Sequence, residues 1–441
     1  MKTLKFGGTS VGRPDRMQHI ARLITLDGDK KIIILSALSG TTNALVEIGE
    51  KLFNKDVTGA EALIGELHAH YTAFIDKLYT NDQYKKSANK SIDQHFGFMS
   101  GLLGSFFNKR LNNELLAQGE LMSTKMFALY LEECGISSEL INALDFMYID
   151  EDKEPDILFI RDKLSTILEL CRDTDIIVTQ GYICRNHEGE IDNLQRGGSD
   201  YTATLIGAAI QSPEVQIWTD IDGMHNNDPR FVSETYPISD LSFNEASELA
   251  YFGAKILHPS SIWPAQKYGV PVRLKNTMDP EAQGTYISSQ EEEKKVKAVA
   301  AKDGITAIKI KSSRMLLAYG FLRKVFQIFE NFKTPIDMIS TSEVAVSLTI
   351  DDANHLKLIT EELDQFGEVA VDTNQTIICI VGNKIVEKEE ILPKVFRALE
   401  NIPVRMISYG GSRYNISVLV DSKYKGDALK GLNKYIFGLK A

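Results

Sequence analysis

Short, continuous runs of apolar residues alternate with longer segments of helical periodicity through the first half of the chain. The clearest runs are Lys31–Ser36, Asp175–Thr179 and Val215–Thr219, and a shorter one, Thr3–Phe6, ends at a pair of glycines. A continuous apolar run is typical of a strand that is buried on both faces. The pattern therefore predicts an α/β fold, a mainly parallel sheet sandwiched by helices.

Residues 51–110 break this alternation, because they carry long helical periods with few turn signals. We expect them to form a helical elaboration on the sheet.

The composition changes at Ser288–Lys297, where serine, glutamine, glutamate and lysine form a solvated, turn-prone segment. We place a domain boundary there, with a catalytic domain over residues 1–290 and a second region over 296–441. The second region predicts two modules of βαββαβ type, which is the ferredoxin-like pattern. The first module covers 305–373 and the second 376–441. Because the second module lacks a final strand, we expect residues 296–301 to complete it.

Composition and charge exclude several classes of protein. The chain has 441 residues, which is too long for one compact domain, and a net charge of −11, which argues against an electrostatic grip on nucleic acid or an anionic membrane. Its apolar runs are all shorter than the roughly 18 residues of a membrane span. The four cysteines lie far apart without a C-x-x-C pair, so we expect reduced, structural thiols and a cytoplasmic protein.

The motif Lys5-Phe6-Gly7-Gly8-Thr9-Ser10 places a lysine at the end of a predicted strand, followed by two glycines and two hydroxyls. Glycines at such a turn let backbone N–H groups approach a phosphate, and the lysine adds a positive charge. The P-loop and the dinucleotide fingerprint are both absent. The alternative is an ordinary tight turn between a strand and a helix.

A second diglycine motif, Arg196-Gly197-Gly198-Ser199-Asp200, precedes a predicted helix. Arginine is suited to bidentate binding of a carboxylate, and Asp200 is placed to orient Lys5. The alternative is a helix start that Ser199 or Asp200 caps.

Three further segments are candidates for binding a nucleotide. Trp218-Thr219-Asp220 ends a predicted strand, Asp228-Pro229-Arg230 follows it, and Phe252-Gly253-Ala254-Lys255 comes later. Each segment alone also fits a β-turn or a helix end. His225 and His258 lack the paired spacing of metal ligands.

Together, these segments resemble the aspartate kinases of the amino-acid kinase family. The resemblance covers nearly the whole chain, and the repeat at its end is similar to the tandem ACT modules of that family. It rests on six motifs in the family order: Lys5-Phe6-Gly7-Gly8-Thr9-Ser10, Gln118-Gly119-Glu120, Arg196-Gly197-Gly198-Ser199-Asp200, Trp218-Thr219-Asp220, Asp228-Pro229-Arg230 and Phe252-Gly253-Ala254-Lys255.

The resemblance implies a site for L-aspartate. Its α-carboxylate would lie on Arg196 and its α-ammonium on Glu120. The residues implied for this site are Ser36, Thr42, Glu120, Tyr182, Arg196 and Ser199. The β-carboxylate, with an ordinary pKa of about 3.9, is ionised at neutral pH and needs no general base. Bringing it to the γ-phosphate of ATP requires positive charge and alignment instead, which the resemblance assigns to Lys5, held by Asp200.

The resemblance also implies a nucleotide site and an effector site. The nucleotide residues are Lys5, Gly7, Gly8, Thr219, Asp220, His225, Arg230, Lys255 and Ile256, and Mg²⁺ would arrive on the ATP with no protein ligand identified. The effector site resembles that of the lysine-inhibited branch and comprises Met315, Gly320, Phe321, Leu322, Ile336, Asp337, Thr341, Ser342 and Glu343. Two positions depart from the family. His225 stands where relatives often carry a tyrosine, and Pro335 lacks a backbone N–H that a relative offers to lysine.

Three hypotheses follow. The first is a monofunctional aspartate kinase, the first enzyme of lysine, threonine and methionine biosynthesis, inhibited by lysine and dimeric through its ACT modules, with a tetramer left open. The second is a kinase of the same fold for another small acid such as glutamate, for carbamate or for a nucleotide. The third is a catalytically silent ACT sensor of amino acids. Glu120 with Arg196 favours a zwitterionic substrate, and the intact Lys5 and Asp200 argue against the silent sensor.

Overall fold

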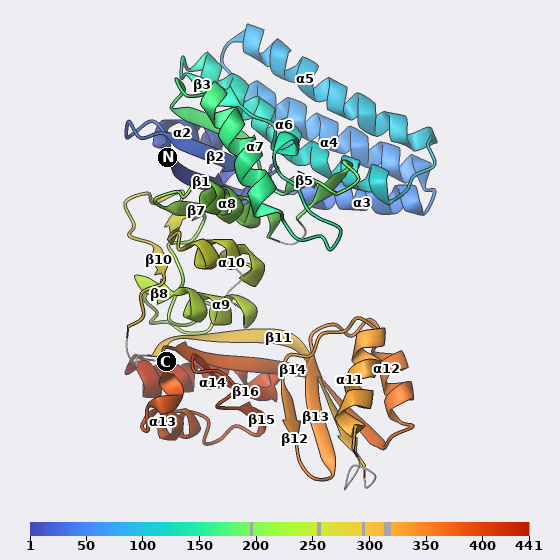
Figure 1. The fold of residues 1–441 in the computed structure, drawn as a ribbon, viewed down its shortest axis with the longest axis vertical. Helices are drawn as coiled ribbons and strands as arrows, with labels where there is room; N and C mark the ends of the chain where they lie inside the picture. The colour runs from blue at the N-terminus through green and yellow to red at the C-terminus, as the bar shows by residue number, and fades with distance from the viewer. Residues whose placement is uncertain (195–196, 254–256, 293–295, 313–318, 441) are drawn as a thin grey trace. The chain divides into compact units, whose positions relative to one another are not determined.

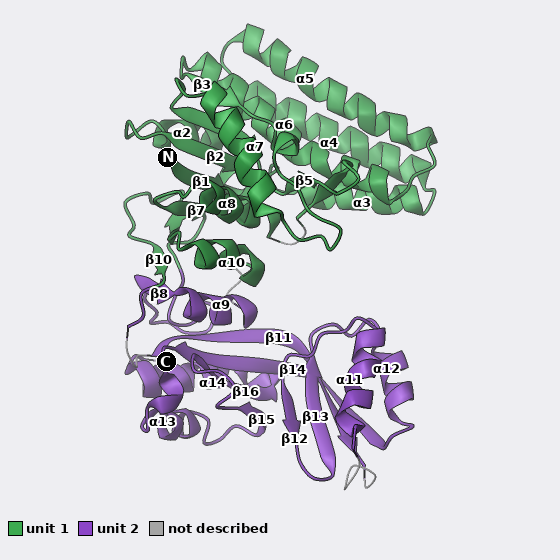
Figure 2. Ribbon diagram, viewed as in Figure 1, with its two compact units in different colours: residues 1–223, 257–289 green, residues 224–256, 290–441 purple. Residues whose placement is uncertain are grey.

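The structure is a computed structural model that describes residues 1–194, 197–253, 257–292, 296–312 and 319–440. These residues form two compact units (Figure 2). The first comprises residues 1–223 and 257–289, and the second comprises 224–256 and 290–441. Residues 224–256 thus fold with the C-terminal part of the chain, whereas the predicted catalytic domain runs without a break from 1 to 290. The functional division into catalytic and regulatory regions stays a prediction.

A mainly parallel sheet forms the centre of the first unit, with the strand order β3-β4-β2-β1-β7-β9-β10 (Figure 1). Every pair is parallel except β9 with β10. The strands are β1 (Lys2–Phe6), β2 (Lys31–Leu35), β3 (Ser138–Leu140), β4 (Ile176–Gln180), β7 (Val215–Thr219), β9 (Val272–Asn276) and β10 (Thr285–Ser288). All residues of β2 and β4 are buried, so both faces of the central strands are covered, as their apolar runs predict.

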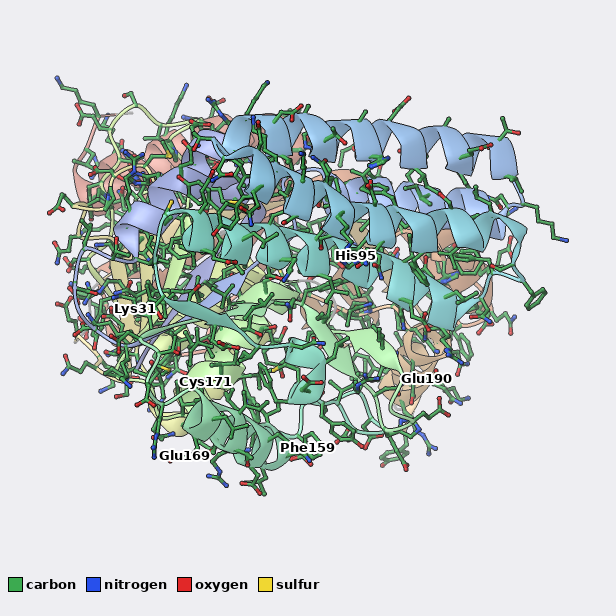
Figure 3. All side chains as sticks on the ribbon, turned by 90° about the horizontal axis from the view of Figure 1, so that it is seen from above. Lys31, His95, Phe159, Glu169, Cys171 and Glu190 are labelled. Atoms are coloured by element: carbon green, nitrogen blue, oxygen red, sulfur yellow. The ribbon has the colours of Figure 1, made fainter. Side chains whose placement is uncertain are left out.

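Helices cover this sheet. Helix α6 packs on β2, β3 and β4, and helix α8 on β1, β2 and β7. Seen from above, Lys31 lies between the helical layer that carries His95 and helix α7, which carries Phe159 and Glu169 (Figure 3). The helices of the unit are α1 (Gly8–Val11), α2 (Pro14–Leu23), α3 (Thr41–Phe53), α4 (Val57–Leu78), α5 (Asp82–Gly101), α6 (Lys109–Glu133), α7 (Ile157–Leu170), α8 (Gly198–Ala209) and α10 (Pro259–Tyr268). A short hairpin, β5 (Ile183–Arg185) with β6 (Ile191–Asn193), lies outside the main sheet.

The helical elaboration that the periodicity of 51–110 predicts is present as α4 and α5, and it packs with α3 and α6. Its interior is apolar, with Leu67, Tyr71, Phe74 and Phe96 buried. Asp56, Asn81 and Asn108 cap the helix starts with their side chains, so the turns between the helices are specified locally.

The second unit contains an antiparallel sheet with the order β12-β13-β11-β14-β16-β15. Its strands are β11 (Val296–Lys311), β12 (Ile339–Thr341), β13 (Ala345–Ile350), β14 (Glu368–Gly382), β15 (Val404–Ser408) and β16 (Asn415–Asp421), and a short strand β8 (Asp240–Ser242) precedes α9. The helices are α9 (Phe243–Tyr251), α11 (Phe321–Asn331), α12 (Leu356–Leu363), α13 (Ile391–Ala398) and α14 (Lys425–Leu432). Two separate apolar clusters, one beneath α11 and α12 and one beneath α13 and α14, give each ferredoxin-like module its own core.

Strand β11 extends through both modules. Its first part, from Val296 to Lys302, pairs with Ile377–Gly382 of β14, and its second part, from Ala307 to Lys311, pairs with Glu368–Asp372. Residues 296–301 therefore add a strand beside the start of the second module. The sequence predicts two strands on either side of Lys302–Gly304. The structure instead has one strand with irregular pairing there, where Gly304 adopts a φ of +76°.

Candidate active site

A pocket of about 830 Å³ opens at the carboxyl ends of strands β1, β2, β4 and β7. Parallel strands present their carboxyl ends at one edge, which is where α/β folds bind ligands. The pocket brings together residues that are far apart in the sequence. Ten residues that the sequence analysis implicates line it: Lys5, Gly7, Gly8, Ser36, Thr42, Glu120, Tyr182, Ser199, Asp200 and Thr219.

The first diglycine turn is crowded around the lysine. A Cβ atom on Gly7 would lie 3.3 Å from Nζ of Lys5, and one on Gly8 would lie 3.2 Å from the carbonyl oxygen of Ala37. Gly7 also precedes the short helix α1, so its neighbours present backbone N–H groups at the edge of the pocket. The turn is tight, as the simpler alternative expects, and it also leaves the approach to Lys5 open.

The Lys5 ammonium is held by one carboxylate. Its Nζ lies 2.6 Å from Oδ1 of Asp200, and the two side chains are 11% and 13% exposed. Asp200 stands in the first turn of α8, whereas Lys5 stands on the neighbouring strand β1. Asp200 is thus placed to orient Lys5, and the catalytic role of the pair stays a prediction.

Both positions of the second diglycine turn require glycine, one because of its backbone conformation and both because of close neighbouring atoms. Gly197 has a φ of +73°, and a Cβ atom there would lie 2.6 Å from Cβ of His258. A Cβ atom on Gly198 would lie 2.7 Å from Cδ2 of Tyr182. Gly197 is the N-cap of α8 and no side chain caps the helix, so the alternative in which Ser199 or Asp200 acts as the cap is wrong.

Glu120 is a buried carboxylate with spare hydrogen-bonding capacity. It lies in the middle of α6 with 3% of its surface exposed, and its Oε1 accepts a hydrogen bond of 3.1 Å from the Ala37 amide. Its Oε2 is buried and has no hydrogen-bond partner in the described structure. Burial raises the pKa of the Glu120 carboxyl to about 8, against the opposing effects of backbone hydrogen bonds and of Lys5. An unpartnered buried carboxylate at a pocket wall is a natural acceptor for a cationic group.

Several pocket residues escaped the sequence analysis. They are Ala37, Leu38, Ser39, Gly40, Asn43, Asn112, Asn113, Leu116 and Asn193. For two groups of these residues, their spacing from a predicted site residue could have indicated a place in the pocket. Gly40 and Asn43 stand at the start of α3 beside the predicted Thr42, and Asn113 and Leu116 precede Glu120 by seven and four residues, on the same helix face.

Other predicted site residues lie elsewhere. Arg196, Lys255 and Ile256 lie outside the described residues. Asp220 follows the pocket residue Thr219, whose hydroxyl donates a hydrogen bond of 3.2 Å to Oδ1 of Asp220, but Asp220 itself does not line the pocket. His225 and Arg230 belong to the second unit, where Nδ1 of His225 lies 3.0 Å from the hydroxyl of Thr235.

The predicted effector residues belong to the first ferredoxin-like module, except Met315, which lies outside the described residues. Gly320 is the N-cap of α11 with a φ of +81°, Phe321 is buried in the module core and Leu322 is exposed. Ile336 packs on the same core. Thr341 ends β12, and Ser342 and Glu343 follow it in the turn to β13.

Asp337 differs from its neighbours because it is already paired. Its Oδ1 accepts hydrogen bonds from the Tyr251 hydroxyl at 2.9 Å and from Nζ of Lys302 at 2.8 Å. Lys302 also contacts Asp351 at 2.8 Å. Burial opposes a charge on Lys302, but the two carboxylates outweigh it and raise its pKa. Oδ2 of Asp337 is buried without a partner in the described structure.

The described residues contain no group of three or more His, Cys, Asp or Glu side chains that could hold a metal ion. They also contain no helix whose length and apolarity would suit a membrane span.

The fold and the pocket together define an amino acid kinase. A profile of the Amino acid kinase family matches residues 2–276, and a profile of the ACT domain matches residues 378–435. Among curated relatives, aspartokinase 2 of Arabidopsis thaliana chloroplasts is 34% identical over 98% of this chain and 84% of its own length. The lysine-sensitive aspartokinase 3 of Escherichia coli is 31% identical over 98% of both chains.

The comparison with solved structures gives the same family as the comparison with curated relatives. The crystal structure of E. coli aspartokinase III in complex with aspartate and ADP matches with a TM-score of 0.87 at 30% identity, covering 99% of this chain and 100% of that one. Its complex with lysine and aspartate matches with a TM-score of 0.83 and covers 99% of both chains. The chain belongs to the aspartokinases of the amino acid kinase family.

Proposed function

We propose that the protein transfers the γ-phosphoryl group of ATP to the β-carboxylate of L-aspartate and forms 4-phospho-L-aspartate. The observation that carries this proposal is Oε2 of Glu120, which has no hydrogen-bond partner among the described residues and lies at the wall of a pocket that also holds the Lys5–Asp200 pair. The pocket thus offers an acceptor for an α-ammonium group and a cation for a phosphate. The E. coli relative solved with aspartate and ADP supports the same pair of ligands.

In this mechanism, aspartate binds with its ammonium group on Glu120. Ser199 and Thr42 offer hydroxyls at the pocket wall, and Arg196 would bind the α-carboxylate. Tyr182 forms an aromatic wall, and its ring packs so closely on Gly198 that a Cβ atom there would lie 2.7 Å from Cδ2. The β-carboxylate is then directed at the γ-phosphate.

The reaction forms a bond between a β-carboxylate oxygen and the γ-phosphorus and breaks the bond from the γ-phosphorus to the β,γ-bridging oxygen. The electron pair of that bond leaves with ADP, and no proton has to move because the carboxylate is already ionised. Two anions must approach each other, so the Lys5 ammonium neutralises charge at the transferring group. The Ser36 hydroxyl and the Gly8 amide add donors, whereas the Gly7 amide donates at 3.3 Å to the Trp218 carbonyl oxygen and contributes through its lack of a side chain.

Mg²⁺ is expected to accompany ATP. Magnesium usually keeps several waters and is held by one or two carboxylates together with substrate phosphates.

Regulation and assembly complete the proposal. The ferredoxin-like modules serve as ACT modules that bind L-lysine through the residues around Asp337, and the enzyme forms a homodimer through them. The named lysine sensitivity of the E. coli relative supports this assignment. The product would begin the synthesis of lysine, threonine and methionine, and the cytoplasmic location remains a prediction.

The direct test is ATP-dependent formation of aspartyl hydroxamate, with glutamate in place of aspartate as the control. We expect activity with aspartate only, and inhibition when lysine is added but not when threonine or methionine is added. Equal activity with glutamate would contradict the assignment of aspartate as the substrate and would favour an amino acid kinase of other specificity. If no hydroxamate forms in the presence of ATP and Mg²⁺, the hypothesis of a catalytically silent amino-acid sensor becomes the better one.

A further inference from the structure

The start of helix α3 forms part of the pocket wall, although no side chain caps this helix. Gly40 is its N-cap residue with a φ of +85°, and Gly40, Thr42 and Asn43 all line the pocket. The neighbouring helices α4, α5 and α6 each begin with a side-chain cap, which fixes their first turns locally. The position of the first turn of α3 therefore depends on contacts with other parts of the first unit.

Thr41, the first residue of α3, is held through both branches of its side chain. It is 1% exposed, and its Oγ1 lies within hydrogen-bond distance, 3.1 Å, of Oη of Tyr71. Its methyl group faces Gly119 of α6, where a Cβ atom would lie 3.2 Å from Cγ2 of Thr41. A β-branched side chain has few rotamers, so these two contacts also fix the backbone that carries it. Thr41 stands between Gly40 and Thr42, which both line the pocket.

Tyr71 brings this contact from the helical elaboration. It lies on α4, is fully buried, and its ring packs edge-on against Phe96 of α5 at a centroid distance of 5.9 Å. Burial and the charge of Glu120 raise the pKa of Tyr71 above its ordinary value, against the opposing effect of the hydrogen bond with Thr41. The hydroxyl is therefore neutral at any pH at which the protein works. Tyr71 itself does not line the pocket.

Two contacts from α6 hold the beginning of the segment that leads into α3. Oγ of Ser123 donates to the Ser36 carbonyl oxygen at 2.8 Å, and the Ala37 amide donates to Glu120 at 3.1 Å. The hydroxyl of Tyr71 acts at the other end of the same segment. The segment is thus held at both ends, and its second end continues directly into the first turn of α3.

We propose that Tyr71 is a positioning residue for aspartate binding, through which the helical elaboration sets the first turn of α3 at the pocket wall. The inference rests on the proposed function, in which the Thr42 hydroxyl faces aspartate. Without the Tyr71 hydroxyl, the buried hydroxyl of Thr41 lacks this partner. It regains a partner only when the first turn of α3 shifts, and Thr42 shifts with it.

The test is the steady-state kinetics of Tyr71→Phe in the hydroxamate assay. Phenylalanine keeps the ring that packs on Phe96 and removes only the hydroxyl. We expect the KM for aspartate to rise about three- to tenfold, as the loss of one buried hydrogen bond implies, while kcat and the KM for ATP change less than about twofold. An unchanged KM for aspartate overturns the proposal. An equal rise in the KM for ATP also contradicts it, because the whole pocket would then be distorted.

The matched control is Tyr79→Phe. Tyr79 directly follows α4 and is also buried, and its hydroxyl donates to the Met126 carbonyl oxygen at 2.6 Å. Neither Tyr79 nor Met126 lines the pocket. We expect Tyr79→Phe to leave the KM for aspartate within about twofold of the parent value, whatever its effect on thermal stability. If both variants raise this KM alike, the role of Tyr71 is structural and the proposal falls.

Variants of Thr41 test whether the hydroxyl pair carries the effect. Thr41→Val keeps the shape and removes the hydroxyl, so it should raise the KM for aspartate as Tyr71→Phe does. Thr41→Ser keeps the hydroxyl and should stay within about twofold of the parent value. The double variant with valine and phenylalanine should be no worse than the poorer single variant, because both changes remove one contact. Full additivity, or a rise in Thr41→Ser equal to that in Thr41→Val, contradicts the proposal.

Thr42→Val separates this inference from the proposed function. If the parent enzyme forms no hydroxamate from aspartate, the proposed function fails and the inference fails with it. If Thr42→Val leaves the KM for aspartate unchanged, the assignment of Thr42 to aspartate is wrong, and Tyr71 has nothing to position. If Thr42→Val raises this KM and Tyr71→Phe does not, only the inference fails.

Discussion

Nζ of Lys5 lies 2.6 Å from Oδ1 of Asp200, and little of either side chain is exposed. The strand β1 supplies the lysine and the first turn of α8 supplies the carboxylate. Removing one partner of such a pair leaves the other as an uncompensated charge in a poorly solvated place. The pair therefore fixes where the ammonium points before any substrate binds, which is the preorganisation that electrostatic catalysis needs.

Replacing Lys5 by methionine or alanine should lower kcat by at least about 100-fold and leave the KM for aspartate nearly unchanged. The lysine acts on charge that is concentrated at the transferring phosphoryl group, whereas aspartate is bound by other residues of the pocket. Hydroxamate formation at saturating ATP measures both constants. Turnover close to that of the parent enzyme would remove Lys5 from its assigned role.

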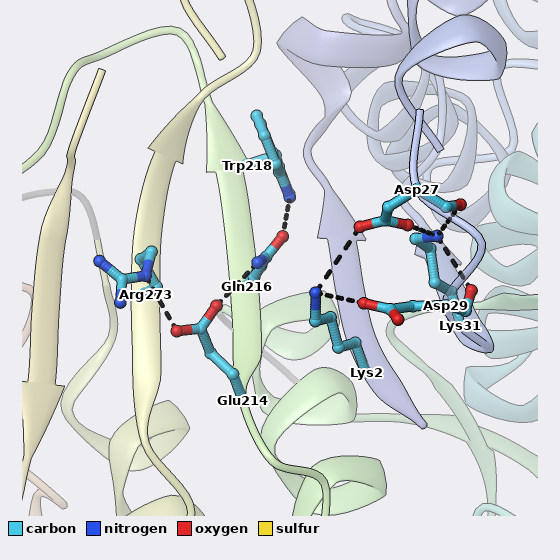
Figure 4. Close-up of polar contacts among 8 residues, drawn as sticks. All are labelled: Lys2, Asp27, Asp29, Lys31, Glu214, Gln216, Trp218 and Arg273. Carbon is cyan, nitrogen blue, oxygen red and sulfur yellow. Dashed lines mark hydrogen bonds and ion pairs between the residues drawn. The ribbon is translucent and has the colours of Figure 1, made fainter. Parts of the chain in front are cut away.

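Lys31 provides the matched control for this substitution. It is a buried lysine on the neighbouring strand β2, and its ammonium contacts Asp27 and the carbonyl oxygen of Asp29 (Figure 4). It stands at the first residue of its strand, away from the carboxyl ends that form the pocket. We expect Lys31→Met to lower thermal stability while kcat stays within about twofold of the parent value.

Glu120→Gln should raise the KM for aspartate by about 10- to 100-fold, because an amide cannot replace a carboxylate opposite an ammonium group. The hydrogen bond from the Ala37 amide can still form, so the fold should persist. Glu114→Gln, on the same helix and outside the pocket lining, is the control. Equal values of KM for the two variants would contradict the assignment of Glu120 to the ammonium group.

The pH dependence of kcat/KM for aspartate should report on the same carboxyl. Burial raises the pKa of Glu120 to about 8, so in the free enzyme at pH 7 it is mostly protonated and must lose its proton to pair with an ammonium group. Hence kcat/KM should rise with pH up to about 8 and then level off. In Glu120→Gln this rise should disappear. A rise of the same size in the variant would mean that another group titrates.

The same ionisation of Glu120 should make the folded protein less stable as the pH rises, whereas it makes kcat/KM larger. The pKa of Glu120 is about 8 in the folded protein and 4.5 for an ordinary glutamate, so between these values the folded state holds a proton that the unfolded state has released. The free energy of unfolding should therefore fall as pH rises from about 5 to 8. In Glu120→Gln, urea unfolding at several pH values should show less of this decline; an identical slope would contradict the raised pKa.

The sequence predicts the parallel sheet and the diglycine turns well because their signals are local. A fully buried strand such as Lys31–Leu35 consists almost entirely of consecutive apolar residues, which is visible in the sequence. Gly197 occupies a left-handed conformation that glycine favours, so the residue type itself indicates the turn. The asparagines of the pocket, Asn43, Asn112 and Asn113, are not predicted, since an asparagine on a helix can be recognised only by its spacing from a residue already assigned to the pocket. Arg196 cannot be compared, because it lies outside the described residues.

Two contacts of the second unit were also beyond the reach of sequence patterns. Gly253 has a φ of +118°, and a Cβ atom there would lie 2.2 Å from the Ala301 carbonyl oxygen, so Gly253 packs directly on strand β11. Likewise, the loop of Asp228 and Arg230 is held by Asn433 near the end of the chain. Both pairings join segments separated by tens to hundreds of residues, and only the folded chain brings them together.

Asp337→Ala should relieve inhibition by lysine, raising the concentration for half inhibition at least about tenfold, with kcat unchanged. An effector ammonium has to compete for a carboxylate that already accepts hydrogen bonds from Tyr251 and Lys302, and the buried Oδ2 remains as its acceptor. Asp351→Ala is the control, because it also removes a partner of Lys302 but is 38% exposed and stands outside the effector motif. Coupled assays with lysine titrated to millimolar concentrations measure the effect. If the parent enzyme ignores lysine over this range, or if both variants lose inhibition equally, Asp337 is a structural partner of Lys302 and the effector lies elsewhere.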